Sequence, residues 1–191
     1  MFEQLRNIPP ATMEKLQPYL QPFRRIEVPA KTCLLREGEI ARKFYWIEQG
    51  CVRACFNNDG ADITFQFFFE HTAVASIESF RKNIASLIAI ETIEPCVLYC
   101  ADKQDVEALL TAVSGDPQLR ELLLETIFER TFDYMKHFLS FIRDTPQQRY
   151  ERLLQERPEL VRRVPQHYIA SYLGISSVHL SRIKSRIAKG K

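Results

Sequence analysis

Residues 165–191 read PQHYIASYLGISSVHLSRIKSRIAKGK, and this stretch decides the fold of the C-terminal region. We predict a helix over 166–173, which Gly174 ends because a sharp turn between helices needs a residue that tolerates positive φ. We expect Ser176 to cap a second helix by accepting a hydrogen bond from a free backbone N–H. The apolar positions that would face inward are Ile169, Leu173, Ile175, Leu180, Ile183 and Ile187. This pattern predicts two helices packed across one tight turn.

The outward face of the second predicted helix carries short hydrogen-bonding side chains and arginines, and no carboxylate. Such a face can enter the major groove of DNA, where an arginine can bind both O6 and N7 of guanine. In a helix-turn-helix, residues at the start of the second helix reach the base edges. The candidate DNA-binding residues are therefore Ser176, Ser177, Val178, His179, Ser181, Arg182, Lys184 and Arg186. The alternative is a helical hairpin with no role in DNA binding.

The charge distribution along the chain points to the same region. The whole chain carries 26 Lys and Arg against 24 Asp and Glu, for a net charge of +2. Residues 143–191 hold 11 of the basic and 4 of the acidic residues, so this segment is +7 and the remainder is −5. A basic segment on an acidic body indicates a polyanionic partner, most simply nucleic acid. A solvated basic tail would also explain the charge.

Residues 24–101 have the short apolar runs and frequent turns that are typical of β-strands. Two of these runs, 51–56 and 61–69, flank Asn57-Asn58-Asp59-Gly60, which is a strong hairpin-turn signal. Further strands are predicted over 43–49, 88–93 and 96–101. These strands predict a small antiparallel roll or barrel. Before them, residues 1–23 have apolar residues at helical spacing and predict one or two short helices.

A long helix is predicted from Asp116-Pro117, a cap and first helical position, to Arg143. Apolar residues recur in it with heptad spacing, which indicates contact with a partner helix. The candidate dimerisation residues are Leu124, Phe128, Thr131, Met135, Phe138 and Ile142. The alternative is a single helix buried in its own domain. Thr145 is expected to cap the next helix, and residues 159–164, between two prolines, are expected to form a linker.

The other chemically versatile residues do not form a recognisable site. The five cysteines are spaced unlike a zinc knuckle and are expected to be free thiols, with Cys51, Cys55, Cys96 and Cys100 as small core residues. Glu70, Glu78 and Glu91 are the acids expected inside or beside the pocket of the roll, and paired carboxylates could indicate a hydrolase, but no second motif supports that alternative. No phosphate-cradling glycine loop occurs. The sequence predicts no enzyme activity, no metal and no cofactor. No apolar run approaches a membrane span and no secretory signal is recognised, so we expect a cytoplasmic protein with no membrane partner.

The C-terminal segments VPQHYIASYLGI and LSRI resemble the DNA-binding end of the Crp/Fnr superfamily of bacterial transcription regulators. Residues 36–56, REGEIARKFYWIEQGCVRACF, resemble the first half of that family's cyclic-nucleotide-binding-type roll, including the turn glycines Gly38 and Gly50. The resemblance covers residues 10 to 188. It implies an α+β fold with an N-terminal antiparallel, jelly-roll-like β-roll, a long dimerisation helix and a C-terminal all-α helix-turn-helix domain. The corresponding domains are a sensor roll with flanking helices over 1–115, the dimerisation helix over 116–143 and the DNA-binding domain over 144–191.

The sequence departs from that family at two places. Members that bind cyclic nucleotide carry a Gly-Glu pair and, about ten residues on, an Arg followed by Ser or Thr. The matching positions here are Ala73-Val74 and Ile84-Ala85, which cannot hold a ribose hydroxyl or a cyclic phosphate. We therefore expect no cyclic AMP binding. The sequence after the second helix is also too short for the β-hairpin wing of many members, so we expect no full wing.

The resemblance implies a homodimer that places its recognition helices in successive major grooves, with Ser177, Val178 and Arg182 at positions that usually touch DNA. We predict a sequence-specific transcription regulator of the Crp/Fnr type, with double-stranded DNA as its partner. A small-molecule effector of unknown identity is a further expected partner, and its binding residues are unknown. The alternative is a small-molecule-binding signalling module whose C-terminal helices contact protein instead of DNA. Salt dependence of binding separates the two.

Overall fold

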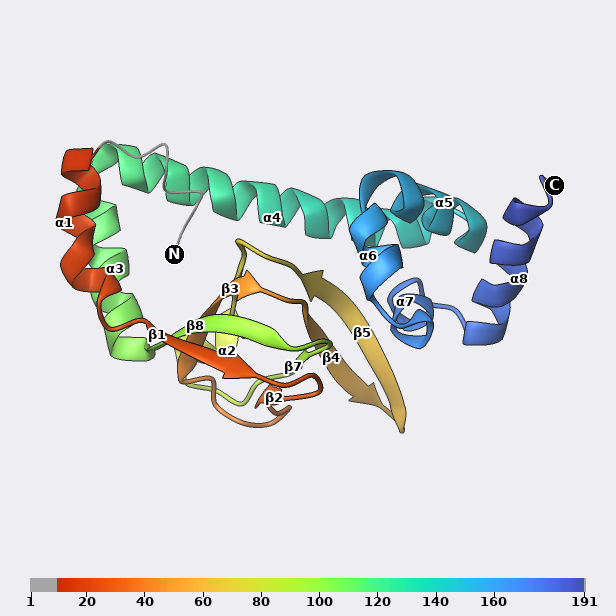
Figure 1. The fold of residues 1–191 in the computed structure, drawn as a ribbon, viewed down its shortest axis with the longest axis horizontal. Helices are drawn as coiled ribbons and strands as arrows, with labels where there is room; N and C mark the ends of the chain where they lie inside the picture. The colour runs from red at the N-terminus through yellow and green to blue at the C-terminus, as the bar shows by residue number, and fades with distance from the viewer. Residues whose placement is uncertain (1–9, 191) are drawn as a thin grey trace. The chain divides into compact units, whose positions relative to one another are not determined.

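The computed structural model describes residues 10–190, with side chains from residue 14 onward, and contains helices and antiparallel strands (Figure 1). The described chain forms two compact units. The first unit contains the chain up to Phe56 and from Phe67 to Thr126, and the second contains Asn57–Gln66 and the chain from Ile127 onward. This division passes through the long helix, so it differs from the three predicted functional domains, whose limits stay a prediction.

The strands form two four-stranded antiparallel sheets, which belong to the first unit except for the hairpin residues Asn57–Gln66. One sheet has the strand order β1-β8-β3-β6 and the other has the order β2-β7-β4-β5. The strands are β1 (Arg24–Val28), β2 (Cys33–Leu35), β3 (Lys43–Gln49), β4 (Val52–Asn58), β5 (Ala61–Phe68), β6 (Ala73–Val74), β7 (Ala89–Thr92) and β8 (Cys96–Asp102). Burial of apolar side chains on the facing surfaces holds the sheets together. The most deeply buried of these are Ile47, Val52, Phe67, Val74, Ile90 and Leu98.

The longer strands agree with the sequence prediction. The limits of β3 are those predicted, and β7 and β8 lie within or one residue beyond the predicted runs. The turn between β4 and β5 has positive φ at Asp59 (50°) and Gly60 (88°), as a type I′ hairpin requires. The Asn57 Oδ1 accepts a hydrogen bond from the Gly60 N–H at 2.8 Å and closes this turn.

Three short elements of the first unit were not predicted: β2, β6 and α2 (Ile77–Lys82). Each is six residues or shorter, so none shows a full period of apolar residues. The helix α2 ends at Asn83, which adopts the left-handed conformation with φ 55°. At the predicted turn Gly50, φ is 109°, and a Cβ atom would lie 2.5 Å from the Cys96 Sγ, so the site needs glycine.

Two helices flank the sheets in the first unit, and a third leaves it. Helices α1 (Pro10–Leu20) and α3 (Lys103–Gly115) lie side by side in Figure 1, which agrees with their contacts. The helix predicted near the N-terminus is thus α1, while residues 1–9 lie outside the described residues. The long helix α4 (Pro117–Arg143) starts where predicted. The Asp116 Oδ1 accepts hydrogen bonds from the N–H groups of Gln118 (3.0 Å) and Leu119 (3.3 Å), which confirms the cap.

The second unit contains the C-terminal part of α4 and four further helices. They are α5 (Pro146–Glu156), α6 (Pro158–Arg163), α7 (Gln166–Tyr172) and α8 (Ser177–Ala188). The predicted Thr145 cap is confirmed, because its Oγ1 accepts from the Gln148 N–H and the Gln148 side chain accepts in return. The prediction of a linker over 159–164 is wrong. Pro158 is well suited to a first helical turn and Leu160 is fully buried, so this segment folds as α6.

Candidate nucleic-acid interface

The turn between α7 and α8 forms as the sequence predicts. Gly174 adopts φ +67°, and the Ile175 N–H donates to the Ala170 carbonyl at 3.0 Å. The Ser176 Oγ accepts from the His179 N–H at 3.2 Å and caps α8. The first helix ends at Tyr172, one residue before the predicted end. These local hydrogen bonds fix the angle at which α8 leaves the turn.

The inward faces of α7 and α8 form a small apolar core. Ile169, Leu173, Leu180 and Ile183 are each at most 2% exposed, and Ala170 is buried between them. The remaining predicted inward residues, Ile175 and Ile187, are half-buried. Because this core holds one face of α8, the opposite face must point into solvent.

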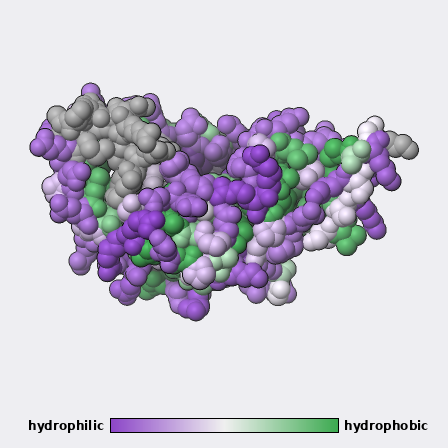
Figure 2. Space-filling view, in the orientation of Figure 1, coloured by the Kyte–Doolittle hydropathy of each residue, from purple (hydrophilic) through white to green (hydrophobic). Residues whose placement is uncertain are grey.

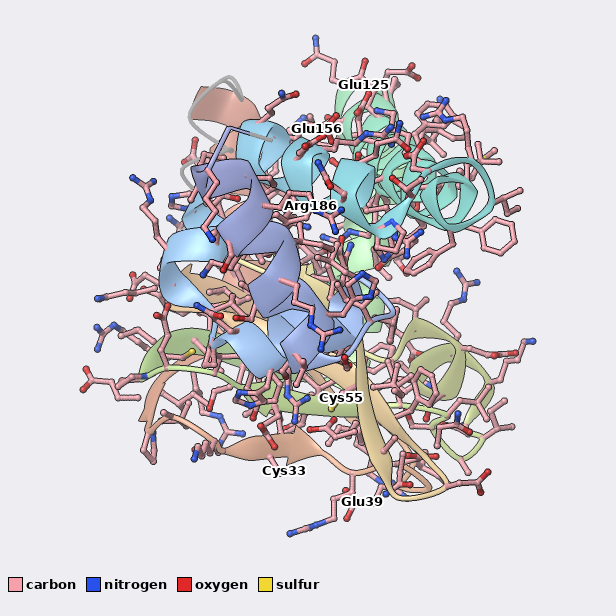
Figure 3. All side chains as sticks on the ribbon, turned by 90° about the vertical axis from the view of Figure 1, so that its right-hand side faces the viewer. Cys33, Glu39, Cys55, Glu125, Glu156 and Arg186 are labelled. Carbon is pink, nitrogen blue, oxygen red and sulfur yellow. The ribbon has the colours of Figure 1, made fainter. Side chains whose placement is uncertain are left out.

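The predicted DNA-binding residues occupy that opposite face. Seven of the eight are exposed, and Lys184 is half-buried; the exposed ones are Ser176, Ser177, Val178, His179, Ser181, Arg182 and Arg186. In Figure 3 α8 faces the viewer and carries the labelled Arg186. In Figure 2, the right-hand part, where Figure 1 places α5 to α8, is a mosaic of hydrophilic and hydrophobic residues. The α8 sequence contains no acidic residue, so its exposed face is electropositive.

One residue of this face is also engaged with α5. The Arg186 Nη1 donates to the Gln147 Oε1 at 3.1 Å. The two helices border an open groove of about 500 Å³, which is lined by Thr145, Pro146, Gln147, Gln148, Glu151, His179, Ile183 and Arg186. Arg186 is therefore held at the groove edge, and the exposed Arg182 lines a second, shallow hollow beside it.

The predicted dimerisation residues lie on the surface of α4. Five of the six have large apolar side chains that are between 40% and 71% exposed: Leu124, Phe128, Met135, Phe138 and Ile142. Thr131 is exposed too, and its Oγ1 donates to the Ile127 carbonyl at 2.8 Å. An apolar stripe of this length is unusual on a monomer, and it is typical of a surface that another molecule covers.

A cluster around the end of α4 was not predicted. The ring of His137 stacks on that of Tyr172, with centroids 4.2 Å apart, and meets Phe141 edge-on at 5.0 Å. Phe141 in turn lies under the Arg149 guanidinium at 4.7 Å. Burial and the charges of Arg157 and Arg149 lower the pKa of His137 to about 4. The stack of His137 on Tyr172 joins residues 35 positions apart in sequence, so no local pattern signals it.

Another unpredicted contact involves the hairpin tip, which belongs to the same unit. The Ser171 Oγ on α7 accepts from the Thr64 N–H at 2.8 Å and donates to the Asp62 carbonyl at 3.0 Å. One serine hydroxyl thus bridges a donor and an acceptor on the strand edge. Nothing in the sequence distinguishes this serine from the others in the region.

In the first unit, the two positions that match the family's nucleotide-binding pairs lie on either side of α2. Ala73-Val74 forms β6, and Ile84 and Ala85 are exposed in the loop after α2. The serines nearby bond internally: the Ser79 Oγ accepts from the Ala41 N–H (2.9 Å) and donates to the Ile84 carbonyl (2.6 Å). The Ser86 Oγ bonds the Ser76 Oγ at 2.9 Å.

The cysteines lie where the core interpretation predicted. Cys51, Cys55, Cys96 and Cys100 are buried, Cys33 is exposed, and all five are free thiols. Within residues 10–190, no group of three or more His, Cys, Asp and Glu side chains could hold a metal ion. No helix in this described range is long and apolar enough to cross a membrane.

The comparisons with known proteins agree with this architecture. Residues 25–112 match the family model of the cyclic nucleotide-binding domain. No curated protein sequence matches the chain significantly. Among solved structures, CLP of Xanthomonas campestris, a c-di-GMP-responsive global regulator, has a TM-score of 0.73 at 20% identity over 95% of this chain and 93% of its own.

Two further structures are similar over most of their length. CooA of Carboxydothermus hydrogenoformans has a TM-score of 0.69 at 15% identity, over 93% of this chain and 84% of its own. A cyclic nucleotide-binding domain containing protein from Listeria monocytogenes has a TM-score of 0.68 at 17% identity, over 94% and 91%. The predicted α+β fold, with a jelly-roll-like domain and C-terminal helices, is confirmed. Residues 25–112 match the cyclic nucleotide-binding domain family, and the chain shares its fold with CLP and CooA.

Proposed function

We propose that this protein is a sequence-specific, DNA-binding transcription regulator that acts as a homodimer in the cytoplasm. The observation that carries the proposal is the exposed face of α8, which presents Ser177, Arg182 and their neighbours without any carboxylate. In this function, residues 144–191 bind DNA, 116–143 join the subunits and 1–115 sense an effector. The fold shared with CLP and CooA supports the proposal. Binding, not catalysis, is the proposed activity.

The α8 face fits the major groove chemically. Arginine forks can bind guanine O6 and N7, and short hydroxyl side chains let the helix approach the base edges closely. We assign base contacts to the first turns of α8 from Ser176 to Arg182, since these positions reach furthest into the groove in helix-turn-helix proteins. Lys184 and Arg186, further along, are assigned to phosphate contacts and to the rim of the interface.

The exposed apolar stripe of α4 is the proposed dimer interface. Its exposed heptad residues would bury several hundred Å² of apolar surface in a coiled-coil pair, at about 25 cal/mol per Å². Phe138 lies at the centre of the C-terminal half of the stripe. Phe138→Glu should therefore yield a monomer in sedimentation equilibrium, while Lys136→Glu, on an exposed polar position of the same helix, should stay dimeric. A dimeric F138E variant would place the interface elsewhere.

The roll is proposed to sense an effector other than cyclic AMP. Ala73-Val74 and Ile84-Ala85 cannot provide the carboxylate and guanidinium that such a ligand requires. The hydroxyls of Ser76, Ser79 and Ser86 bond to other groups of the same loops. The two matching positions are thus aliphatic and the serine hydroxyls are bonded internally, while α2 between them carries the charged residues Glu78, Arg81 and Lys82.

Salt dependence tests the DNA proposal against the alternative of a protein-binding module. Fluorescence anisotropy with a mixed-sequence duplex should show log K falling linearly with log salt, by about 0.9 for each phosphate that the protein neutralises. We expect a slope near −4 or steeper for a dimer that contributes several Lys and Arg residues. No DNA binding at low salt would favour the protein-binding module.

A further inference from the structure

The second unit contains an arginine that connects three chain segments. Arg149 lies in the first turns of α5, and its Nη1 donates to the Asp144 carbonyl at 2.8 Å, just after α4 ends. Its Nη2 donates to the Leu173 carbonyl at 3.0 Å, where α7 ends. Carbonyls at helix ends lack partners within their own helix, so they are strong acceptors for a guanidinium. One planar fork thus links the end of α4 to the end of α7.

The third segment is the last part of α4. The ring of Phe141 lies under the Arg149 guanidinium at 4.7 Å, which is a cation–π distance. The same ring lies against the helix-turn-helix turn: a Cβ atom on Gly174 would be 2.8 Å from the Phe141 Cε1. The turn that presents α8 therefore packs directly on the end of α4, and Arg149 covers this contact.

A second arginine in the same place makes different contacts. Arg152, one turn further along α5, pairs with the Asp144 carboxylate at 2.7 Å and with Glu156 at 4.0 Å. Both of its carboxylate partners belong to α5 or to the residues just before it. Arg152 therefore stabilises the α4–α5 corner, whereas Arg149 reaches across to α7.

We propose that Arg149 is a positioning residue that fixes the orientation of α7 and α8 on the end of α4. In the homodimer proposed above, on which this inference rests, that orientation sets the distance between the two recognition helices. The two half-sites of such a DNA site lie about 34 Å apart. A small rotation of α7 and α8 relative to the end of α4 would therefore change the half-site spacing that the dimer binds best. A lysine cannot replace this arginine, because a single ammonium lacks the planar fork that reaches both carbonyls.

The test compares Arg149→Gln, Arg149→Lys and the control Arg152→Gln in the full-length protein. The probes are duplexes with an inverted repeat, selected by the wild type, whose half-site spacing is changed one base pair at a time, and a duplex with one half-site. We expect the wild type and R152Q to prefer one spacing by about tenfold, equivalent to about 1.4 kcal/mol. The affinities of R149Q for the different spacings should lie within about threefold of one another, and the spacing preference of R149K should be intermediate. The affinity of each variant for the single half-site should stay within about twofold of the wild-type value.

Each outcome decides the inference. If R149Q and R149K keep the wild-type spacing preference, Arg149 does not position the recognition helices. Equal weakening on every duplex, including the single half-site, would show a structural role only and overturn the inference as well. R149K keeps the charge and the aliphatic stem, so its spacing preference tests the inference if R149Q does not fold. A wild type that selects no inverted repeat would overturn the proposed function itself, which is a different result from a changed spacing profile.

Discussion

The outward face of α8 and the loop after α2 differ in chemistry. The outward face of α8 is polar and basic, with exposed serines and arginines. The loop after α2 exposes Ile84 and Leu87, and the hydroxyls of its serines bond internally. The exposed face of α8 therefore suits an anionic polymer, whereas Ile84 offers no charged group to a nucleotide.

The largest effect is expected at the turn that presents α8. Gly174→Ala should lower the free energy of unfolding by about 2–4 kcal/mol, since the residue has positive φ and its Cβ would meet Phe141. Gly115→Ala is the matched control, because no atom lies within 4 Å of the Cβ position there. It should be neutral or stabilising by up to about 1 kcal/mol. Urea denaturation measures both, and a tolerated G174A variant would mean that the turn is not under this constraint.

The next effect concerns the base-reading role of α8. Arg182→Ala should weaken binding to a selected site by about 1–3 kcal/mol and relax preference at one base pair, if the guanidinium binds guanine. Arg42→Ala, an exposed arginine of the first unit, should leave DNA binding unchanged. Binding titrations on the selected site and its single-base variants measure this effect. Equal weakening of R182A on all duplexes would identify a phosphate contact instead.

A smaller effect is expected from the half-buried His137, whose ring stacks on Tyr172. The pKa of His137 is lowered to about 4, mainly by burial, so an unfolded chain with a histidine pKa near 6.5 binds a proton that the folded protein does not. This contribution to stability is therefore present above pH 6.5 and is lost as pH falls towards 4.

The measurement for this histidine is denaturation at pH 7 and pH 5. The wild type should lose about 1–2 kcal/mol more than His137→Phe, whose ring can keep the stack on Tyr172 without titrating. Identical pH dependence in the two proteins would mean that the surroundings of His137 do not lower its pKa.

The smallest effect is expected from cyclic AMP. A ligand present at about 100 times its dissociation constant stabilises a protein by about 2.7 kcal/mol, which is easily seen as a rise in Tm. We expect no such rise at millimolar cyclic AMP, because Ala73-Val74 and Ile84-Ala85 offer neither a carboxylate nor a guanidinium. A saturable rise would show that this roll holds the nucleotide by other groups, and the contrast between α2 and α8 would lose its basis.

Features set by neighbouring residues were predictable from the sequence. Gly174, Ser176, Thr145 and Asp116 act within four residues of themselves, and each caps or ends a helix as predicted. The heptad pattern of α4 could be recognised because it extends over about three heptads, and its apolar residues are exposed; their role in dimerisation stays a prediction. The fold class followed from such local patterns together with the family resemblance.

Features set by distant contacts were not predictable. Arg149 looks like any basic residue of an amphipathic helix until it meets Leu173, 24 positions away. The helix α6 is too short to show periodicity, and it is held by the burial of Leu160. The partners of His137 and Ser171 likewise come from separate segments, so only the folded chain reveals them.

Selection of duplexes from a random DNA pool by the purified protein, at moderate salt, tests the central claim most directly. We expect enrichment of an inverted repeat whose half-sites lie one helical turn apart, about 10 base pairs centre to centre. The enriched sequence should be lost with the monomeric F138E variant and altered at one base pair with R182A. A folded dimer that enriches no sequence, with or without cell extract as a source of effector, would contradict the account.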